Sequence, residues 1–509
     1  MSDCTACSGS GHVCSGGCIP ASLSHPFEQS DEAWRDACGV FGVYAPGTDV
    51  ANYIYFGLYA LQHRGQEGCG MAVWDGKTMR HHKGLGLAAQ VFNEQIIKDM
   101  VGDIAVGHVR YSTTGGNTFV NTQPMLGEGK FGPFAVTHNG NLINTTALRH
   151  DLEARGVEFH ATSDTEVIVK LIEAADAATI EEAVAEAMKK MRGAYSLGIL
   201  APGKLLAVRD PNGVRPLAVG QINGSGWAIA SETCALHVIG AEFVREVQPG
   251  EIVTLDSKGL SSLQAVSPGR RSCCIFEFIY FARPDTHIYG KSVYMSRLRM
   301  GHLLAQQAPV DADLVIPVPE SALPHAMGYA QVSKIPYGEG LIKNRYIFRT
   351  FIAPDQRLRD LGVKMKLTPL RENLAGRRVI VVDDSIVRGT TTGPEVELLR
   401  EAGAREIHLR ISSPPIKYPC FYGIDTSAGR KELIAARMTV PEIQEFLNAD
   451  SLEYLDLKNL VKAVGLPKGN FCTACFDRQY PIPVPREIKV TKFDLEKPAE
   501  APAPAESPA

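Results

Sequence analysis

A buried strand that ends in two adjacent carboxylates limits the folds open to this chain more than any other feature. Residues 378–382 (RVIVV) include four consecutive β-branched residues, apolar on both faces, which is typical of a strand inside a parallel sheet. Asp383 and Asp384 follow directly, then a loop of small residues and a helix predicted to start near Pro394. Because open α/β sheets bind ligands at the carboxyl ends of their strands, this segment predicts a binding site.

The loop after the two aspartates has the chemistry of a phosphate site. Small residues let backbone N–H groups approach a phosphate, threonine hydroxyls add donors, and a helix N-terminus favours an anion. The carboxylates suit sugar hydroxyls or a hard cation such as Mg²⁺. The alternative is a solvated acidic strand end before an ordinary turn. The candidate substrate-binding residues are Asp383, Asp384, Ser385, Arg388, Gly389, Thr390, Thr391 and Thr392.

Two further segments agree with a phosphorylated ligand. Residues 313–319 predict another strand, which leads to Ser321, and a basic stretch runs from Lys343 to Lys366. Cations there could neutralise a pyrophosphate leaving group, although such a loop is equally a solvated surface. The strand, acidic pair and loop resemble the ribose-5-phosphate motif of type I phosphoribosyltransferases. The resemblance implies that the acidic pair holds ribose hydroxyls and the loop holds the 5-phosphate.

Length and charge exclude several classes of protein. The 509 residues exceed one ordinary domain of roughly 100–200 residues, so two or three units are predicted. A hydrophobic fraction of 45% excludes a mainly disordered chain. The net charge of −4 offers no basic field for nucleic acid, and no apolar run approaches the roughly 18 residues of a membrane span. We expect a soluble, cytoplasmic protein whose partners include neither nucleic acid nor a membrane.

The pattern of the chain changes near residue 270. Before it, short apolar runs such as 134–137 and 194–200 alternate with turns, and helical patterns cover 165–178 and 180–191. After it, apolar strands are followed by helices, as in a parallel α/β sheet. The predicted units are a cysteine-rich leader 1–37, a first domain 38–268, a second domain 269–480 and a tail 481–509, disordered at its end.

Cys38 begins the string CGVFGV, which resembles the start of the mature chain in class II glutamine amidotransferases of the N-terminal nucleophile type. A Cys-Gly pair alone would more often be structural. Four blocks that resemble those of the same family follow it, at residues 61–67, 107–113, 138–141 and 163–166. The resemblance implies an N-terminal nucleophile hydrolase fold, the αββα sandwich, in which the Cys38 thiol attacks the glutamine amide and its own α-amine acts as base.

The same resemblance assigns the other groups of a glutaminase site. It implies that Arg110 pairs with the α-carboxylate of glutamine and that Asp164 takes its ammonium. Asn139 and Gly140 match the oxyanion hole. An internal Cys38 has no α-amine, so this chemistry requires removal of residues 1–37 as a propeptide. The leader cysteines could bind a metal during maturation, or the leader is under little constraint; they are Cys4, Cys7, Cys14 and Cys18.

Taken together, residues 38 to about 480 resemble the amidophosphoribosyltransferase family. The resemblance implies that ammonia released from glutamine passes through an internal channel and displaces pyrophosphate from phosphoribosyl pyrophosphate, giving 5-phosphoribosylamine for purine synthesis. It also implies Mg²⁺ at Ser321, Asp383 and Asp384, phosphoribosyl pyrophosphate binding by Lys343 and Lys366, and a flexible loop between these lysines. Relatives are homotetramers inhibited by purine nucleotides, which we expect here.

Four late cysteines match the [4Fe-4S] ligands of the iron–sulfur branch of this family: Cys274, Cys420, Cys472 and Cys475. Four thiolates can hold such a cluster, and zinc in a four-cysteine site is the chemical alternative. Three other functions stay open. They are a phosphoribosyltransferase that uses free ammonia because Cys38 is never exposed, a nucleotide sensor without catalysis, and another class II amidotransferase.

Overall fold

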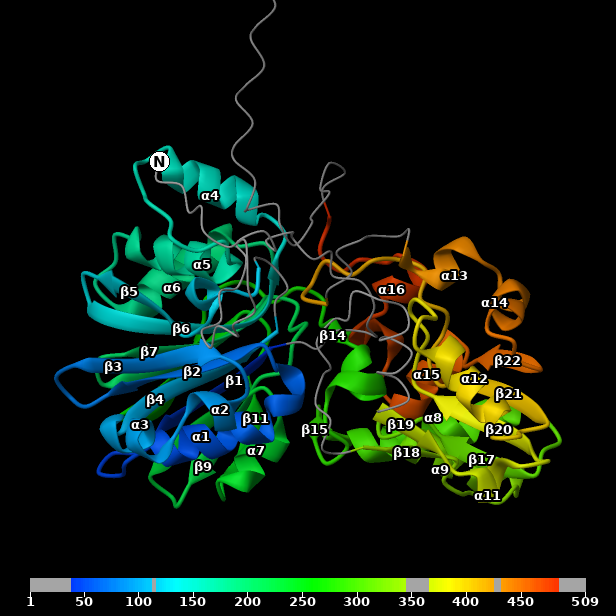
Figure 1. Cartoon of the computed structure of the whole chain (residues 1–509). Helices are drawn as coiled ribbons and strands as arrows, with labels where there is room; N and C mark the ends of the chain where they lie inside the picture. The colour runs from blue at the N-terminus through cyan, green and yellow to red at the C-terminus, as the bar shows by residue number, and fades with distance from the viewer. Residues whose placement is uncertain (1–37, 112–115, 345–365, 425–431, 485–509) are drawn as a thin grey trace, which may run out of the picture. The chain divides into compact units, whose positions relative to one another are not determined.

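Two antiparallel sheets form the first part of the chain (Figure 1). The computed structural model describes residues 38–111, 116–344, 366–424 and 432–484. The seven-stranded sheet, in the order β11-β9-β10-β1-β4-β2-β3, comprises β1 Gly39–Tyr44, β2 Gly68–Trp74, β3 Met79–Leu85, β4 Ile104–Arg110, β9 Ala218–Ile222, β10 Gly226–Ala230 and β11 Glu242–Glu246. The six-stranded sheet, in the order β13-β12-β8-β7-β6-β5, comprises β5 Met125–Gly129, β6 Gly132–Leu142, β7 Gly193–Ala201, β8 Lys204–Arg209, β12 Glu251–Asp256 and β13 Gly259–Gln264.

Helices cover the outer faces of both sheets. Apolar side chains of α1 Ala51–Ala60, α2 Ala88–Val91, α3 Glu94–Asp99 and α7 Thr233–Val238 pack against the seven-stranded sheet. Those of α4 Thr145–Glu153, α5 Asp164–Glu173 and α6 Ile180–Lys190 pack against the six-stranded sheet. The inner faces meet in a cluster that includes Val106, Leu205 and Ile229. This is the predicted αββα sandwich of N-terminal nucleophile hydrolases.

The sequence patterns of the sandwich have clear physical causes. β1 and β7 are buried along their whole length, because central strands of a covered sheet are apolar on both faces. The helices predicted at 165–178 and 180–191 are present as α5 and α6, although α5 ends at Glu173, five residues before the predicted end. Ser163 caps α5, and Thr179 with Glu182 forms a capping box at α6, which fixes where each helix begins.

A four-stranded parallel sheet forms the core of the second part. Its order is β17-β20-β21-β22, with β17 Leu314–Pro317, β20 Arg378–Asp383, β21 Glu406–Ile411 and β22 Ser451–Tyr454. The larger helices are α8 Val293–Gln307, α9 Leu323–Ser333, α12 Thr392–Glu401, α14 Val440–Phe446 and α15 Leu457–Val464. The short elements are β14 Cys273–Cys274, η3 Glu277–Phe281, β15 His287–Ile288, β16 Lys291–Ser292, β18 Leu341–Lys343, β19 Leu367–Pro369, α11 Arg371–Leu374, α13 Ile434–Arg437, β23 Phe471–Cys472 and α16 Ala474–Asp477.

Both faces of the parallel sheet are covered, as the run of β-branched residues predicted. Val379 and Val381 join one apolar cluster, whereas Ile380 and Val382 join another on the opposite face. The type I phosphoribosyltransferase fold expected from the sequence is therefore confirmed. The predicted strand 313–319 is shorter, since β17 ends at Pro317.

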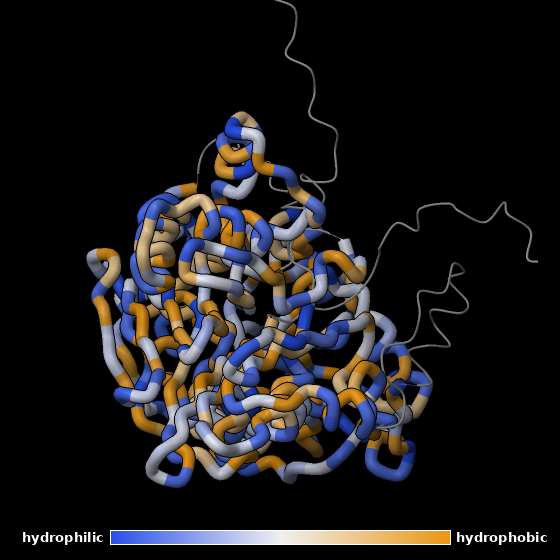
Figure 2. The backbone as a smooth tube through the Cα atoms, turned by 90° about the vertical axis from the view of Figure 1, so that its left-hand side faces the viewer, coloured by the Kyte–Doolittle hydropathy of each residue, from blue (hydrophilic) through white to orange (hydrophobic). Residues whose placement is uncertain are grey.

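Hydrophobic and hydrophilic residues alternate over short stretches along the chain (Figure 2). Such alternation suits elements that bury one face and expose the other. Among the described residues, no helix combines the length and the apolar character needed to cross a membrane.

Candidate functional site

Cys38 lies just before β1, a central strand of the seven-stranded sheet. Its side chain is buried, and its Sγ lies 3.1 Å from the carbonyl oxygen of Tyr111. The Tyr111 backbone N–H donates to the same sulfur at 3.4 Å. Burial raises the pKa of the Cys38 thiol, and the nearby Arg110 guanidinium opposes that rise. A nucleophile in this position needs a base close by.

Arg110 and Asp164 both lie close enough to Cys38 to change the pKa of its thiol: Arg110 lowers that pKa and Asp164 raises it. Arg110 ends β4, which pairs with β1 so that Val109 stands opposite Gly39. Asp164 begins α5, and its Oδ2 accepts the backbone N–H of Leu142 at 3.0 Å. Burial alone would raise the pKa of Asp164, but its interactions with His138, the Leu142 N–H and Arg110 together outweigh burial and lower that pKa. An ionised Asp164 suits an ammonium group.

Asn139 and Gly140 lie on β6, on the strand that also carries His138. Asn139 is fully buried, and neither its amide nitrogen nor its amide oxygen has a hydrogen-bond partner among the described residues. An unpaired buried amide costs about 1–3 kcal/mol, so such a group marks a place where a ligand supplies the missing partner. His108 of β4 lies 3.0 Å from the His138 carbonyl oxygen, which ties the strand of Arg110 to that of Asn139.

A buried network of charged side chains, which no local pattern predicts, holds the backbone of the nucleophile. Arg64 donates from Nε to the Cys38 carbonyl at 3.1 Å and from Nη1 to Glu232 at 2.6 Å. Its two terminal nitrogens also contact both carboxylate oxygens of Glu277, at 2.9 and 2.8 Å. Arg215 lies 3.3 Å from Glu277. The network therefore joins the sandwich to η3 of the second part.

Asp383 and Asp384 lie at the carboxyl end of β20, where the sequence placed them. Ser385 donates to Asp384 at 2.6 Å, and Ser321 hydrogen-bonds the same carboxyl group. Burial and the charge of Asp384 raise the pKa of Asp383 well above its ordinary value, and burial raises that of Asp384. Buried carboxylates with a hydroxyl beside them are an oxygen donor set that fits a hard divalent cation.

The predicted phosphate loop follows the acidic pair directly, and the two candidate lysines lie at the β18–β19 ribbon. Gly389 has a φ of 79°, a conformation that glycine adopts without strain. The helix after the loop, α12, begins at Thr392, two residues before the predicted Pro394. Lys343 stands opposite Leu367 in the β18–β19 ribbon, so Lys343 and Lys366 lie at the same end of it. The loop expected between these lysines falls outside the described residues, apart from its ends.

Two features near the acidic pair differ from the expectation of an open binding loop. Arg388 contacts Glu432 at 2.6 Å, so a phosphate would compete with a carboxylate for it. Glu395 of α12 is a third buried carboxylate, whose pKa burial and Asp384 raise to about 8. Sequence reasoning missed Glu395, because an acidic residue in the first turn of a helix is ordinarily solvated.

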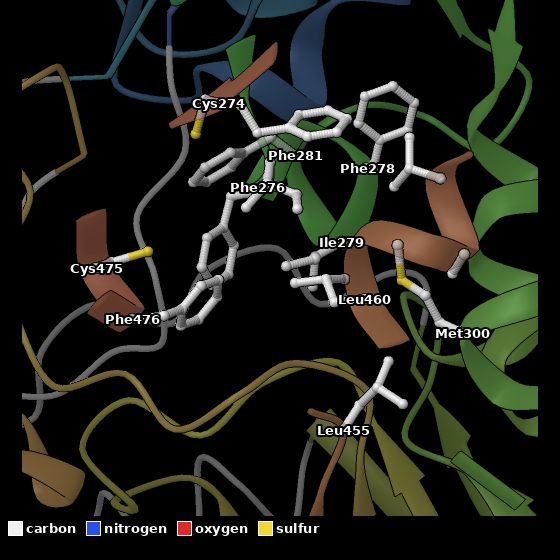
Figure 3. Close-up of a cluster of buried hydrophobic side chains, with 14 of the residues drawn as sticks. Cys274, Phe276, Phe278, Ile279, Phe281, Met300, Leu455, Leu460, Cys475 and Phe476 are labelled. Carbon is white, nitrogen blue, oxygen red and sulfur yellow. The ribbon is translucent and has the colours of Figure 1, made fainter. Parts of the chain in front are cut away.

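The four candidate iron–sulfur cysteines come together from three segments. Cys274 of β14 stands opposite Cys472 of β23 in a parallel pair, and Cys475 follows in α16. Burial raises the pKa of Cys475 well above its ordinary value, and the nearby Cys472, Cys274 and Cys420 raise it further. Figure 3 shows Cys274 and Cys475 near Phe276. The ring of Phe276 stacks on that of Phe476, with 5.5 Å between the ring centroids. Burial raises the pKa of Cys274 to about 12.

The structure does not arrange these thiols around a single metal ion. Among the described residues, no three or more His, Cys, Asp or Glu side chains are placed to hold a single metal ion. One zinc ion would need its sulfurs about 3.8 Å apart, from Zn–S bonds of about 2.3 Å. A cluster of four irons is larger, so its ligands stand further apart around it. Four thiols, of which Cys274 and Cys475 are buried and Cys420 and Cys472 are partly exposed, form a donor set that fits such a cluster.

The fold and these two groups of residues define a class of protein. A sandwich with a buried cysteine beside an arginine and an aspartate is a glutaminase of the N-terminal nucleophile type. A parallel sheet that ends in an acidic pair and a phosphate loop is a phosphoribosyltransferase. One chain that carries both is a glutamine amidotransferase with a phosphoribosyl acceptor.

Comparisons with known proteins identify the family. Residues 108–238 match the family model of the glutamine amidotransferase domain. The amidophosphoribosyltransferase of Synechococcus elongatus is 50% identical over 467 residues, covering 91% of this chain and 94% of its own, and that of Mycobacterium tuberculosis is 48% identical over 482 residues, covering 92% and 91%. The solved glutamine phosphoribosylpyrophosphate amidotransferase of B. subtilis, in complex with ADP and GMP, is 44% identical with a TM-score of 0.84, covering 88% of this chain and 98% of its own. The chain belongs to the amidophosphoribosyltransferase family, enzymes of purine biosynthesis that transfer the amide nitrogen of glutamine to phosphoribosyl pyrophosphate.

Proposed function

We propose that this chain makes 5-phosphoribosylamine, glutamate and pyrophosphate by two half-reactions at the two sites described above. The observation that carries the proposal is that one chain holds both a buried Cys38 in the field of Arg110 and Asp164 and a buried acidic pair at a sheet edge. Either site alone would fit a glutaminase or a phosphoribosyltransferase of another kind. Both together fit the reaction of this family.

In the first half-reaction, Cys38 attacks the side-chain carbonyl carbon of glutamine. Arg110 holds the α-carboxylate and Asp164 holds the ammonium, so the amide is presented to the sulfur. Asn139 and the Gly140 N–H stabilise the oxyanion. The α-amine, freed by removal of residues 1–37, takes the thiol proton and passes it to the leaving ammonia. Water then hydrolyses the glutamyl thioester to glutamate.

In the second half-reaction, ammonia that has travelled inside the protein displaces pyrophosphate from carbon 1 of the ribose. Asp383 and Asp384 hold the ribose hydroxyls, residues 385–392 hold the 5-phosphate, and Lys343 and Lys366 balance the charge of the leaving pyrophosphate. Mg²⁺, held by Ser321, Asp383 and Asp384, would supply charge neutralisation of that pyrophosphate. Exclusion of water protects both the thioester and the ribosyl centre from hydrolysis.

The four late cysteines, unlike Cys38, belong to the structure of the enzyme and not to its chemistry. Cys274, Cys420, Cys472 and Cys475 would hold a [4Fe-4S] cluster, which would join β14, β23 and the segment of Cys420 as a structural link. The pairing of β14 with β23, which puts Cys274 opposite Cys472, supports a shared site for these thiols. We place the chain in the iron–sulfur branch of the family, with residues 1–37 as its propeptide.

Regulation and assembly follow the family. Purine nucleotides are proposed as feedback inhibitors, supported by the ADP and GMP in the B. subtilis relative. A homotetramer and a cytoplasmic location stay predictions from the sequence.

Native mass spectrometry on protein purified without oxygen tests the proposal. The expected result is a chain that begins at Cys38 and carries the mass of a four-iron cluster. Glutamine and ammonia should then both support synthesis of 5-phosphoribosylamine. A full-length chain that works only with ammonia would contradict the glutamine half-reaction, and a processed chain with one zinc ion would contradict the cluster.

A further inference from the structure

The three residues that follow Cys420 lie against the strand of the candidate oxyanion hole. Gly423 has a φ of 100°, and a Cβ placed on it would lie 2.9, 3.0 and 3.1 Å from the C, O and Cα atoms of Gly140. Real side chains do not approach a backbone this closely, and a backbone cannot rotate aside as a side chain can. The two glycines are therefore in direct backbone contact.

Gly140 is confined on its other side as well. A Cβ on Gly140 would lie 2.1 Å from the carbonyl oxygen of Ala194 on β7, the neighbouring strand. The Gly140 peptide is thus enclosed between the backbone of β7 and the backbone of Gly423. Any change that pushes on Gly140 from the side of Gly423 must shift β6 itself, the strand that carries Asn139.

Hydrogen bonds from the sandwich fix the segment in this place. Asn141 donates its side-chain N–H to the Phe421 carbonyl at 3.1 Å. Arg215 donates from Nε and Nη2 to the Tyr422 carbonyl at 3.2 and 3.1 Å. Each of the residues 421, 422 and 423 therefore makes a contact with the glutaminase part, although the segment itself comes from the second part of the chain.

We propose that Phe421–Gly423 is a positioning segment for the glutamine half-reaction, which sets the place of the Gly140 peptide in the oxyanion hole. The segment acts through Gly140 and touches neither substrate. This inference rests on the proposed role of Asn139 and Gly140. It means that cleavage of glutamine depends on residues from the phosphoribosyltransferase part, in addition to the glutaminase motifs.

The test is Gly423→Ala in the processed, full-length enzyme. Its methyl group must displace Gly140 by a few tenths of an ångström or more. Misplacement of a catalytic group by about 1 Å can cost 10²-fold, so we expect kcat for glutamine hydrolysis to fall about 10- to 100-fold with KM for glutamine within about twofold. Ammonia-dependent synthesis of 5-phosphoribosylamine should keep its wild-type rate, since the second site is untouched.

Gly259→Ala is the matched control. Gly259 has nearly the same φ, 96°, but a Cβ there meets nothing within 4 Å, so this variant has the backbone strain without the contact. It should keep both activities. The rate of Cys38 alkylation by iodoacetamide is a second readout, because alkylation needs the thiol but no oxyanion hole. It should be unchanged in Gly423→Ala, which a general distortion of the glutaminase site would not allow.

Three results would overturn the inference. Wild-type glutamine hydrolysis in Gly423→Ala would remove the positioning role. Equal loss of the glutamine and ammonia activities, with Gly259→Ala normal, would make the segment merely structural. Normal hydrolysis in Asn139→Ala, with a defect in Gly423→Ala, would show that the oxyanion assignment in the proposed function is wrong and that this route of action fails with it.

Discussion

Asn139 shows at the scale of one residue how a binding group differs from a structural one. Its amide is fully buried without a partner among the described residues. Asn121 is equally buried, but its amide donates to the Gly116 carbonyl and the Thr162 hydroxyl, each at 2.9 Å, and accepts the Thr162 N–H at 2.9 Å. One asparagine already contributes to the stability of the fold, whereas the other is available to a ligand.

Replacement of the two asparagines by alanine should therefore have opposite effects. Asn139→Ala is expected to lower kcat for glutamine hydrolysis about 10²- to 10³-fold, the cost of one oxyanion donor. It should leave the free energy of unfolding unchanged or slightly higher. Asn121→Ala should destabilise by about 1–3 kcal/mol, because it leaves buried groups unpaired. Steady-state kinetics and denaturant titration check both; equal destabilisation by the two variants would contradict the distinction.

At the scale of elements, the groups proposed to bind phosphoribosyl pyrophosphate and Mg²⁺ lie together at the carboxyl edge of the parallel sheet. β20 delivers Asp383 and Asp384, the loop after β17 brings Ser321, and α12 adds Glu395. The opposite edge carries an ordinary ion pair, in which Arg378 contacts Asp313 at 2.7 Å. The same sheet thus carries acidic residues with a proposed role in catalysis at its carboxyl edge, whereas Asp313 at the opposite edge only forms an ion pair.

Asp384→Asn tests this division. We expect ammonia-dependent transfer to fall about 100-fold or more, because loss of the charge weakens Mg²⁺ binding and charge neutralisation of pyrophosphate by several kcal/mol. Glutamine hydrolysis measured without phosphoribosyl pyrophosphate should continue. Asp313→Asn makes the same substitution at the opposite edge of the sheet, just before β17, and should leave transfer near wild type. Isothermal titration with Mg²⁺ should show weaker binding for Asp384→Asn alone.

Helices α8 and α9 cross so closely that their backbones touch. A Cβ on Gly301 would lie 1.9 Å from the His325 carbonyl oxygen, and one on Gly328 would lie 2.0 Å from that of Leu298. Gly301→Ala is therefore expected to lower the free energy of unfolding by at least about 3 kcal/mol, as severe overpacking does. Gly469→Ala, where a Cβ meets nothing within 4 Å, is the control and should stay within about 1 kcal/mol of wild type. Thermal unfolding of both variants measures the difference, and equal stability of the two would contradict the close backbone contact.

Over the whole molecule, charged side chains buried between segments far apart in the chain connect the two parts. Glu232 accepts hydrogen bonds from Arg64 at 2.6 Å, from Thr286 at 2.8 Å and from the Arg283 N–H at 2.9 Å. Burial alone would raise the pKa of Glu232, but His63 and Arg64 outweigh it and hold that pKa well below its usual range. The carboxylate therefore stays ionised and paired at neutral pH.

This lowered pKa gives stability a definite pH dependence. A carboxyl whose folded pKa is depressed stabilises the fold above its unfolded pKa, about 4.5, and that contribution is lost as pH falls below it. Glu232→Gln should be less stable at pH 7 by about 1.5–3 kcal/mol, because Arg64 keeps Glu277 but loses its charge-assisted hydrogen bond to Glu232. Below pH 4.5 its stability should fall less steeply than that of wild type, by up to about 1.4 kcal/mol per pH unit.

Denaturant titrations between pH 7 and pH 3 measure both effects. Glu94→Gln is the control, because Glu94 belongs to an exposed pair with Lys98 and should show wild-type stability and slope. Parallel pH curves for Glu232→Gln and wild type would contradict the assignment.

The sequence could predict what depends on local patterns. Such features are contiguous runs of residues, so their pattern can be recognised in the sequence. They are the strand before Asp383, the helices α5 and α6, and the blocks around Cys38, Arg110 and Asn139. The ion pair between Arg64 and Glu277, which are 213 positions apart, cannot be predicted from a local pattern. A charged residue becomes buried only through tertiary contacts. From the sequence alone, a charged residue is expected to lie at the solvent-exposed surface. Gly423 was missed for the same reason, because its neighbour Gly140 is remote in the chain.

The contacts of Arg64 and Arg215 with the second part also limit how such a chain could be recombined. A fusion that joined residues 38–268 to the phosphoribosyltransferase of another protein would bury both guanidinium groups without the carboxylate of Glu277. The donor would have to bring along η3 and the residues 421–423 for the graft to fold and cleave glutamine. Exchange of either catalytic part therefore means matching a buried surface as well as an active site.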